Sequence, residues 1–243
     1  MTTPDRPQKR KADRKAIKTR IGTHRLLLDN SGALVLPDLS LVAFADLHFE
    51  KGSAFAKRGV LLPPYDSATT LDRMEAVLAC YRPDTVVCLG DSFHDIGGGA
   101  RMVPSIAARL RQLADQRDWI WIQGNHDPGI PDNAAGRAFD SLEQHDLLFL
   151  HELKETVTTP QIAGHFHPKV RIKAGPRRIT RPCFIGDGQR LILPSFGAYT
   201  GGLDIMHPAI ANLFPGPFTA WVISQGSIYA FPSEIAHFLP FKS

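Results

Sequence analysis

Five short apolar segments of this chain each end in a group of aspartate, asparagine, histidine or glycine residues. The segments are residues 41–45, 85–89, 119–122, 147–150 and 161–163. Apolar runs of this length, bounded by polar residues, are typical of buried β-strands. When strands run parallel, the side chains that follow them gather at one edge of the sheet, where ligands bind. We therefore expect polar groups from distant parts of the chain to meet at one site.

The segments around these strands predict the fold class. Residues 66–81 and 103–116 have apolar residues at helical spacing, so a helix should follow each of the first two strands. A β-hairpin over residues 24–37 precedes them, and only short strands are expected after residue 168. We predict an α/β fold in which two facing mixed β-sheets are sandwiched by helices in a single domain. The glycine-rich residues 95–101 predict a loop, either mobile at the rim of the site or a plain linker.

Positive charge is concentrated at the beginning of the chain. The formal net charge is +4, and residues 1–20 hold eight lysines and arginines against two aspartates. Because few apolar residues accompany them, we predict a disordered basic tail over residues 1–22 and a folded domain over residues 23–243. Such a tail aids solubility or contacts nucleic acid phosphates. No segment resembles the apolar core of a secretory signal or a run of about 18 apolar residues that would span a bilayer.

The spacing of the three cysteines indicates the redox state of the cellular compartment in which the protein works. Cys80, Cys88 and Cys183 are widely spaced and form no CxxC pair. This pattern provides no disulfide framework and fits a reducing cytoplasm. Cys80 closes a helical segment and Cys88 lies in an apolar strand, so we expect both thiols in the core. We predict a cytoplasmic protein with no membrane partner.

The first two polar motifs suit divalent metal ions. Asp46 and His48 follow the strand 41–45, and alternate residues of an extended segment point the same way. A carboxylate oxygen and an imidazole nitrogen can then bind one ion. Asp91 ends the next strand, and its two oxygens make it a natural bridge between two ions. Gly90 beside it lets the backbone come close.

The third motif adds a neutral ligand and an acid. The amide oxygen of Asn125 can bind a metal without adding negative charge. His126 beside it would face the substrate and serve as a general acid. A turn explains Gly124-Asn125 and Asp127-Pro128 equally well. The motif therefore supports a metal site only together with the others.

Three further histidines complete the set. His165 and His167 are alternate residues after one strand, so their rings should lie on one side, and His151 follows another strand. Each alone is better explained as an ordinary histidine of the surface or core. Their shared position after strand ends indicates metal ligands. Asp127 and Glu152 are expected either to orient neighbouring histidines or to be surface carboxylates.

The ordered motifs DLH, GD, GNHD, H and GHFH resemble those of the calcineurin-like metallophosphoesterases, over Asp46 to His167. The resemblance implies two β-sheets sandwiched by helices and a centre of two metal ions. It implies a first metal site formed by Asp46, His48, Asp91 and His167. It implies a second, sharing Asp91, formed by Asp91, Asn125, His151 and His165. His126 then takes the place of the family's catalytic histidine.

Longer segments of the sequence indicate which branch of this family the chain resembles. FADLHFEKG, GDSFHD, GNHDPGIP and PSFGAYTGG resemble the bacterial endonucleases associated with DNA ligase and the DNA damage response, the PdeM type. GDSFHD is also similar to the GDLFH motif of repair nucleases, which implies that His94 lies near the scissile phosphate. Many relatives have GDxxD where this chain has Gly90 to His94, so the protein phosphatase branch is disfavoured.

These motifs predict a hydrolase that depends on two divalent metal ions. We expect a hydroxide held between the ions to attack a phosphodiester, with DNA as the substrate and DNA repair as the setting. Mn²⁺ is the expected metal, while Fe and Zn²⁺ also suit mixed nitrogen and oxygen ligands. The resemblance implies repair proteins such as a ligase as partners. The alternatives are a small-molecule phosphodiesterase, a nucleotide pyrophosphohydrolase, or a scaffold that binds metal without catalysis.

A basic strand is expected beside the centre. Lys169, Arg171 and Lys173 alternate with apolar residues, so their side chains should share one face of a strand that leaves the site. This face could bind the phosphates of a nucleic acid. The alternative is an edge strand that its charges protect against unwanted pairing. The strand has no aromatic residue to stack on bases, so recognition of a base sequence is not expected.

Overall fold

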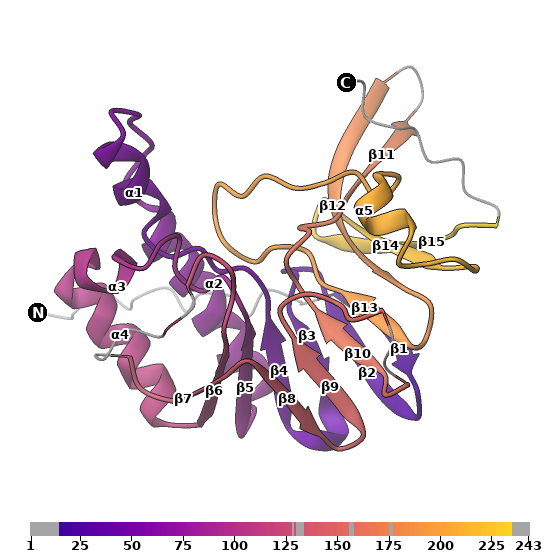
Figure 1. Cartoon of the computed structure of the whole chain (residues 1–243), viewed down its shortest axis with the longest axis horizontal. Coiled ribbons are helices and arrows are strands. Elements are labelled where there is room, and N and C mark those ends of the chain that lie inside the picture. Colours follow the sequence, from indigo (N-terminus) through magenta and orange to yellow (C-terminus); the bar gives the residue numbers. More distant parts are fainter. Residues whose placement is uncertain (1–14, 128, 130–133, 156–157, 175–176, 235–243) are drawn as a thin grey trace, which may run out of the picture.

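The computed structural model describes residues 15–127, 129, 134–155, 158–174 and 177–234. In these residues two β-sheets pack face to face, and helices cover the outer side of the first sheet (Figure 1). The predicted α/β fold of two mixed sheets in a single domain is thereby confirmed. None of the described helices combines the length and the hydrophobicity that a membrane-spanning segment needs.

The first sheet follows the order of the chain. Its strands are β1 (Ala16–Ile21), β2 (His24–Asp29), β3 (Leu34–Leu36), β4 (Leu41–Phe44), β5 (Thr85–Leu89), β6 (Asp118–Ile122) and β7 (Arg137–Phe139). Strands β1 to β4 pair antiparallel, which includes the predicted hairpin, and β4 to β7 pair parallel. The helical connections are η1 (Pro37–Leu39), α1 (Lys51–Lys57), α2 (Asp66–Tyr81), α3 (Gly98–Arg101) and α4 (Pro104–Asp115). The carboxyl ends of β4, β5 and β6 therefore meet at one edge.

The second sheet is mixed and contains the rest of the strands described. Its order is β15 (Ser227–Pro232), β14 (Thr219–Ser224), β12 (Arg177–Gly186), β13 (Arg190–Ile192), β10 (Gln161–Ala163), β9 (Leu147–Leu150) and β8 (Ser141–Gln144). β9, β10 and β13 run parallel. β11 (Lys169–Ala174) pairs with β12 off the main path, and α5 (Pro208–Ala211) lies between β13 and β14 in the chain.

In the described part of the chain, three apolar layers hold the fold together. Between the sheets, Leu28 and Ile120 pack with Phe149 and Phe184, all of them buried. On the other face of the first sheet, α2 and α4 contribute residues such as Met74. The segment around α5 packs on the outer face of the second sheet. Because β4, β5 and β6 are buried on both faces, they are apolar apart from Thr85 and Asp118 at the starts of β5 and β6, and polar residues resume past their carboxyl ends.

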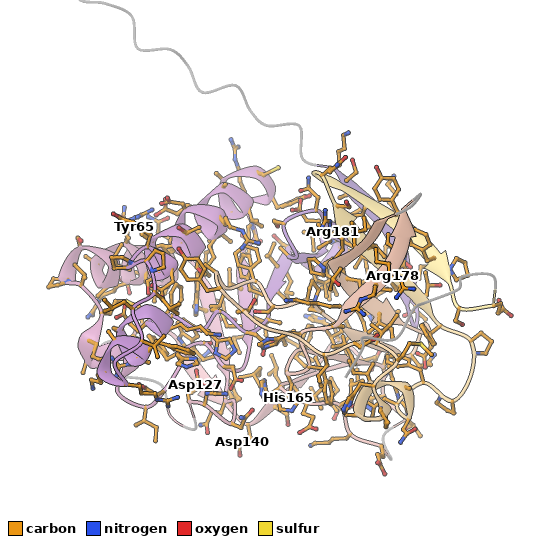
Figure 2. All side chains as sticks on the ribbon, turned by 90° about the horizontal axis from the view of Figure 1, so that it is seen from above. Tyr65, Asp127, Asp140, His165, Arg178 and Arg181 are labelled. Carbon is orange, nitrogen blue, oxygen red and sulfur yellow. The ribbon has the colours of Figure 1, made fainter. Side chains whose placement is uncertain are left out.

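The two halves of the molecule flank a polar region. Seen from above, Tyr65 marks the helical side, and Arg178 and Arg181 mark the side of β11 and β12 (Figure 2). Asp127 and His165 lie between these two sides in the same view. The polar region thus lies where loops of both sheets meet.

The predicted tail over residues 1–22 is wrong for its last part. β1 occupies Ala16–Ile21 and pairs along its whole length with β2. Ile17 and Ile21 pack against the layer between the sheets, while the charged residues beside them remain exposed. The alternation of a strand therefore lies inside a basic segment whose composition alone favours disorder. Residues 1–14 lie outside the described residues.

Two smaller predictions are also corrected. Cys80 is exposed on α2, whereas Cys88 is buried as expected. Gly98–Arg101 form the short helix α3 instead of a loop. Glycine is a poor helix former, but a side chain at Gly98 would come within 3.1 Å of Phe93, so the close packing of this helix favours a glycine there.

Candidate metal centre

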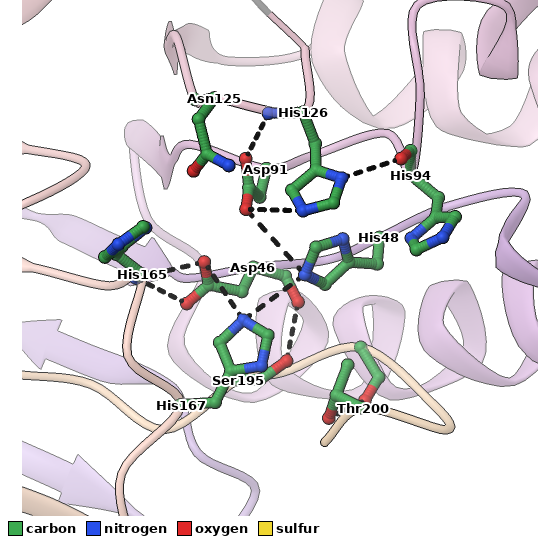
Figure 3. A network of polar contacts seen from close by, with 12 residues as sticks. Asp46, His48, Asp91, His94, Asn125, His126, His165, His167, Ser195 and Thr200 are labelled. Carbon is green, nitrogen blue, oxygen red and sulfur yellow. Dashed lines mark hydrogen bonds and ion pairs between the residues drawn. The ribbon is translucent and has the colours of Figure 1, made fainter. Parts of the chain in front are cut away.

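The polar motifs meet where both sheets end. Asp46 lies two residues after β4, Asp91 two after β5 and Asn125 three after β6. From the second sheet, His151 follows β9 directly and His165 lies two residues after β10. Figure 3 shows side chains from these loops turned toward one another. The expected convergence of distant segments is therefore observed.

A first group able to hold a metal ion consists of Asp46, His48 and His167. The Nε2 atoms of the two imidazoles are 3.2 Å apart, and Nε2 of His167 lies 3.4 Å from Oδ1 of Asp46. The carboxylate also accepts the backbone N–H of His165 at 3.0 Å, so it is held in place. Ring nitrogens this close face the same point in space, as ligands of one ion do.

A second group consists of Asp91, His151 and His165. Nε2 of His151 lies 2.9 Å from Oδ1 of Asn125, 3.0 Å from Nδ1 of His165 and 3.6 Å from Oδ1 of Asp91. Four side chains from four loops therefore surround one position. Oε1 of Glu152 lies 3.8 Å from Nε2 of His165 and its side chain is 57% exposed, so both predicted roles, orientation of this ring and a surface carboxylate, fit its position.

Asp91 lies between the two groups. Its Oδ1 faces His151, and its Oδ2 lies 3.9 Å from Nε2 of His48 in the first group. The backbone N–H of His126 donates to Oδ1 at 2.9 Å, and the residue is almost fully buried. A carboxylate with one oxygen toward each group can serve both. This is the geometry that a bridging ligand needs.

His126 and His94 lie beside the first group (Figure 3). Their rings stack with centroids 5.3 Å apart, and both rings contact that of His48 edge-on. The carbonyl of His94 lies 3.0 Å from Nδ1 of His126, so it accepts the proton on Nδ1. Nε2 of His126 then faces the centre, 4.0 Å from Oδ2 of Asp91. The His126 side chain is 41% exposed, which lets it reach a bound substrate.

The backbone of these loops is strained. Asp46, His48, Asp91, His165 and His167 have φ angles between 45° and 71°. Each costs an L-residue about 1–2 kcal/mol, and such strain concentrates at functional sites. The expectation that alternate residues of an extended segment align these side chains is therefore wrong. Left-handed turns, and not strand alternation, direct them to one point.

Asp127 holds the backbone of the centre, and the prediction that it orients a neighbouring histidine is wrong. Its buried carboxylate accepts hydrogen bonds from the backbone N–H of Ser92 at 2.7 Å, Phe93 at 3.0 Å and Gly124 at 3.2 Å. It thereby ties the loop after β5 to the loop after β6. Burial raises the pKa of this carboxyl to about 6.

Replacement of Asp127 by alanine should destabilise the fold. Buried N–H groups would lose their acceptor, and each such loss costs about 1–3 kcal/mol. Because water can replace part of the contacts, we expect the free energy of unfolding in urea to fall by about 2–5 kcal/mol. The matched control is Asp115→Ala, since this carboxylate is exposed at the end of α4. An Asp127→Ala variant that unfolds at the same urea concentration as the parent would contradict this role.

A segment without a predicted catalytic role holds the Asp46 loop. The hydroxyl of Ser195 and the backbone N–H of Gly197 donate to the carbonyl of Asp46 at 2.8 and 3.1 Å. A side chain at Gly197 would come within 2.1 Å of a backbone oxygen, so only glycine fits. Arg73 of α2 donates to the carbonyl of Phe196 at 2.7 Å. The motif PSFG is visible in the sequence, but its contact with Asp46 arises only in the fold.

Burial favours the neutral form of three imidazoles at the centre. It lowers the pKa of His48 to about 2, and it lowers the pKa of His94 to about 4 with the charge of Lys51 as the next cause. It also lowers the pKa of His165. Neutral imidazoles keep the lone pairs that metal ligands require. Together with carboxylate and amide oxygens they form a donor set that fits divalent ions such as Mn²⁺, Fe and Zn²⁺.

The predicted basic strand is present as β11. Lys169 is partly buried, and its Nζ donates to the carbonyl of Thr200 at 3.2 Å. Arg171 is also partly buried, whereas the side chain of Lys173 lies outside the described part of the structure. Among the described strands β11 pairs only with β12, and Lys169 at its start forms an isolated bridge with Asp204, so the remainder of β11 is an edge strand. Phosphate binding and protection of the edge both fit this position.

A cavity of about 790 Å³ lies away from this centre. Its lining includes Arg25, Gly188 and Trp221, and none of the residues of the two ligand groups. It opens near the start of β13, whereas the centre lies at the carboxyl ends of the parallel strands. The candidate metal centre therefore lies outside this cavity.

Comparison with known proteins shows the family. Residues 39–195, more than half of the chain, match the family model described as calcineurin-like phosphoesterase. This range includes every residue of the two ligand groups. A search among curated proteins finds no match.

Two solved structures are similar to this chain to different degrees. The nuclease MPE of Pseudomonas putida superposes with a TM-score of 0.70 at 22% identity, over 89% of this chain and 100% of that chain. The phosphoesterase YfcE of E. coli is 14% identical over 79% of this chain and 97% of its own, with a TM-score of 0.38. The family match, the two ligand groups and the fold shared with the nuclease MPE lead to one conclusion. The chain belongs to the calcineurin-like phosphoesterase family and is a metal-dependent phosphoesterase.

Proposed function

We propose that this protein hydrolyses phosphodiester bonds of DNA with two divalent metal ions, as an endonuclease of DNA repair in the cytoplasm. The observation that carries the proposal is the position of Asp91, which turns one oxygen toward each ligand group. His126 lies beside it with Nε2 toward the centre. A phosphoester placed next to Asp91 would face both metal positions and the proton donor together.

The two ligand groups would hold the two ions. The first ion would be bound by Asp46, His48, Asp91 and His167. The second would be bound by Asp91, Asn125, His151 and His165. When bound, the ions supply Lewis acidity that stabilises charge on phosphoryl oxygens and lowers the pKa of water. We propose Mn²⁺ because mixed oxygen and nitrogen ligands suit it.

His126 would deliver a proton to the leaving oxygen. The carbonyl of His94 holds the proton on Nδ1, so Nε2 is the atom that exchanges a proton with the substrate. With both ring nitrogens protonated, His126 would give the Nε2 proton to the leaving oxygen as an oxygen from water bonds to phosphorus and the P–O bond breaks, so that the products are an alcohol and a neutral imidazole. General acid catalysis of this kind contributes about 10²–10⁴-fold. The His94 ring stacks on that of His126, where it can contact the phosphate.

Two features favour a polynucleotide over a small phosphodiester. β11 extends basic side chains away from the centre, beginning two residues after His167. The structural relative from Pseudomonas putida is named a nuclease. A DNA repair partner such as a ligase belongs to the same proposal and is supported by the resemblance of the motifs. Co-purification of a ligase with the tagged protein from its own cells would test it.

The first test uses a simple phosphodiester. The parent should cleave bis-p-nitrophenyl phosphate with Mn²⁺ and lose this activity in EDTA. Asn125→Ala removes a neutral ligand 2.9 Å from His151, so kcat/KM should fall by about 10–100-fold. Asn212→Ala, at the exposed end of α5, is the matched control. Full activity of Asn125→Ala would remove the second metal site from the proposal.

The second test concerns the substrate. Nicking of supercoiled plasmid is compared with hydrolysis of a panel of nucleoside di- and triphosphates and dinucleotides, all with Mn²⁺. Nicking at the lower protein concentration supports the nuclease. Hydrolysis of nucleotides with intact plasmid would show that DNA is the wrong substrate. Purified protein with neither stoichiometric metal nor turnover would indicate a scaffold.

A further inference from the structure

Arg101 joins the two loops that carry His48 and His94. It ends α3, and Nη2 of its guanidinium lies 2.7 Å from Oδ1 of Asp95, the residue that follows His94. These two atoms are shielded from solvent, and the Arg101 side chain as a whole is 15% exposed. Nε of Arg101 donates to Oγ of Ser53 in α1 at 3.0 Å. One largely buried cation therefore contacts the segment after β5 and the segment after β4.

The contact with Ser53 continues to the loop of His48. The Ser53 hydroxyl donates to Oε2 of Glu50 at 2.8 Å, and the hydroxyl of Ser67 in α2 donates to Oε1 at 2.8 Å. The backbone N–H of Glu50 donates in turn to the Ser67 oxygen at 2.9 Å. Glu50 lies two residues after His48, is buried and has a φ angle of 65°. These contacts hold the strained backbone after His48 in place.

The segment between Asp95 and Arg101 is shaped to bring these two residues together. The N–H of Gly98 donates to the carbonyl of Asp95 at 2.9 Å, which begins the turn. A side chain at Gly97 would come within 2.7 Å of Nη1 of Arg101, so the absence of one leaves room for the guanidinium. The glycine-rich residues 95–101 thus close into a compact turn, and the ion pair joins its first residue to its last.

The position of His94 affects the proton donor. The carbonyl of His94 lies 3.0 Å from Nδ1 of His126 and accepts its proton (Figure 3). The ring of His94 stacks on that of His126, and on its other side it lies 5.6 Å from the ring of Phe55 in α1. α1 is the helix that Arg101 reaches through Ser53. A shift of His94 would therefore move the group that orients His126.

A buried charge network of this kind contributes little to stability. The cost of removing a guanidinium from water is several kcal/mol, and a buried ion pair does little more than offset it. Charged hydrogen bonds do fix geometry, because a planar guanidinium and its acceptors meet only in a narrow range of orientations. The contacts of Arg101 are therefore better explained by the positions that they define than by stability.

The backbone of His94 has a second anchor, since its N–H donates to the carbonyl of Phe49 at 2.9 Å. Loss of Arg101 should therefore shift this segment without unfolding it. We propose that Arg101 is a positioning residue, which fixes His94 and through it the ring of His126 for proton transfer. This inference rests on the proposed role of His126 as a general acid.

Leaving groups of different acidity test this assignment. Phenol, like the tyrosine side chain, has a pKa of about 10 and needs a proton as it leaves, whereas the more acidic p-nitrophenol leaves with little help. The two esters are diphenyl phosphate and bis-p-nitrophenyl phosphate, both with Mn²⁺. Arg101→Met keeps the apolar stem and removes the charge. It should lower kcat for diphenyl phosphate by about 10–100-fold, at least about five times more than kcat for the nitrophenyl ester, while KM stays within about twofold.

Further variants show whether the effect passes through His126. If Arg101 acts through that ring, Arg101→Met should cause no additional loss of kcat in a His126→Ala background. Arg101→Lys keeps a donor for Asp95 and should recover part of the lost rate. Arg111→Met, at an exposed position on α4, is the matched control and should change the turnover of neither ester. Circular dichroism shows whether each variant is folded.

A measurement without turnover tests the same geometry. Nitrogen-15 NMR of the full chain, with Zn²⁺ in place of the paramagnetic Mn²⁺, shows which ring nitrogen of a neutral histidine carries the proton. In the parent the neutral ring of His126 should carry it on Nδ1. In Arg101→Met this preference should be lost, because the carbonyl of His94 moves.

The outcomes separate this inference from the proposed function. Equal losses on both esters, an unchanged rate on diphenyl phosphate, or an additional loss in the His126→Ala background would each overturn the positioning role. A parent that cleaves both esters and leaves plasmid DNA intact contradicts the nuclease, while the variants still test Arg101. If the parent cleaves neither ester, the proposed chemistry fails, and the NMR comparison alone decides whether Arg101 positions His126.

Discussion

Asp91→Asn is expected to lower kcat for Mn²⁺-dependent phosphodiester cleavage by about 10³-fold or more. The carboxylate has Oδ1 3.6 Å from Nε2 of His151 and Oδ2 3.9 Å from Nε2 of His48, so both ions would depend on it. Asparagine has the same shape and can still accept the N–H of His126. It lacks the negative charge and offers one oxygen. Each ion is worth several kcal/mol of transition-state stabilisation, so weakening both accounts for the expected loss.

Metal content measured beside kcat distinguishes this explanation from misfolding. The parent should contain close to two equivalents of Mn²⁺ after dialysis, and Asp91→Asn should retain less than one. Asp115→Asn, at an exposed position on α4, is the matched control and should keep both metal and activity. If Asp91→Asn retained two ions and turned over within tenfold of the parent, Asp91 would not be the shared ligand.

Gly90→Ala should inactivate the centre without altering any ligand. The φ angle of Gly90 is +75°, and a Cβ there would lie 2.2 Å from Nδ1 of His151. The imidazole must move, and it would then leave the carbonyl of Leu89, now 3.1 Å from Nδ1. A displacement of about 1 Å can cost 10²-fold in rate, so we expect kcat/KM to fall by at least that factor. Binding of the second metal ion should weaken in parallel.

Gly59→Ala is a close control for this variant. Gly59 has a φ of +78°, but no atom lies within 4 Å of the position its Cβ would take. Both alanines therefore incur the same backbone cost of about 1–2 kcal/mol, and only one of them meets a ligand. Thermal unfolding should show a loss in both, while activity should fall in Gly90→Ala alone. An active Gly90→Ala variant would mean that this glycine does not set the position of His151.

The strands and the ligand positions could be predicted because they depend on local order in the chain. Apart from Thr85, the runs that correspond to β4, β5 and β6 are apolar because both faces of these strands are buried. A polar residue can appear only where such a strand leaves the core. Asp46, Asp91 and Asn125 follow the carboxyl ends of these strands. Their position at one edge of the sheet could therefore be predicted without knowledge of any tertiary contact.

Other features could not be predicted because they depend on contacts between distant segments. Ser195 supports the Asp46 loop across 149 positions of the chain. The carboxylate of Asp127 accepts backbone N–H groups 34 and 35 positions away. It therefore bonds to the backbone and not to the neighbouring histidines. The basic residues of β1 dominate its composition and favour disorder, whereas its few apolar residues gain stability only by packing between the sheets.

By itself the sequence determined the two-sheet α/β class and the sheet edge at which the ligands gather. The reason is that the order of apolar and polar residues shows which strands are buried and where each strand ends. Only the tertiary structure decided the backbone conformations that direct the ligand side chains toward one point. Left-handed φ angles at positions such as His48 and His167 are unfavourable locally. They persist because the surrounding packing and hydrogen bonds outweigh their cost, and no local pattern of residues records that balance.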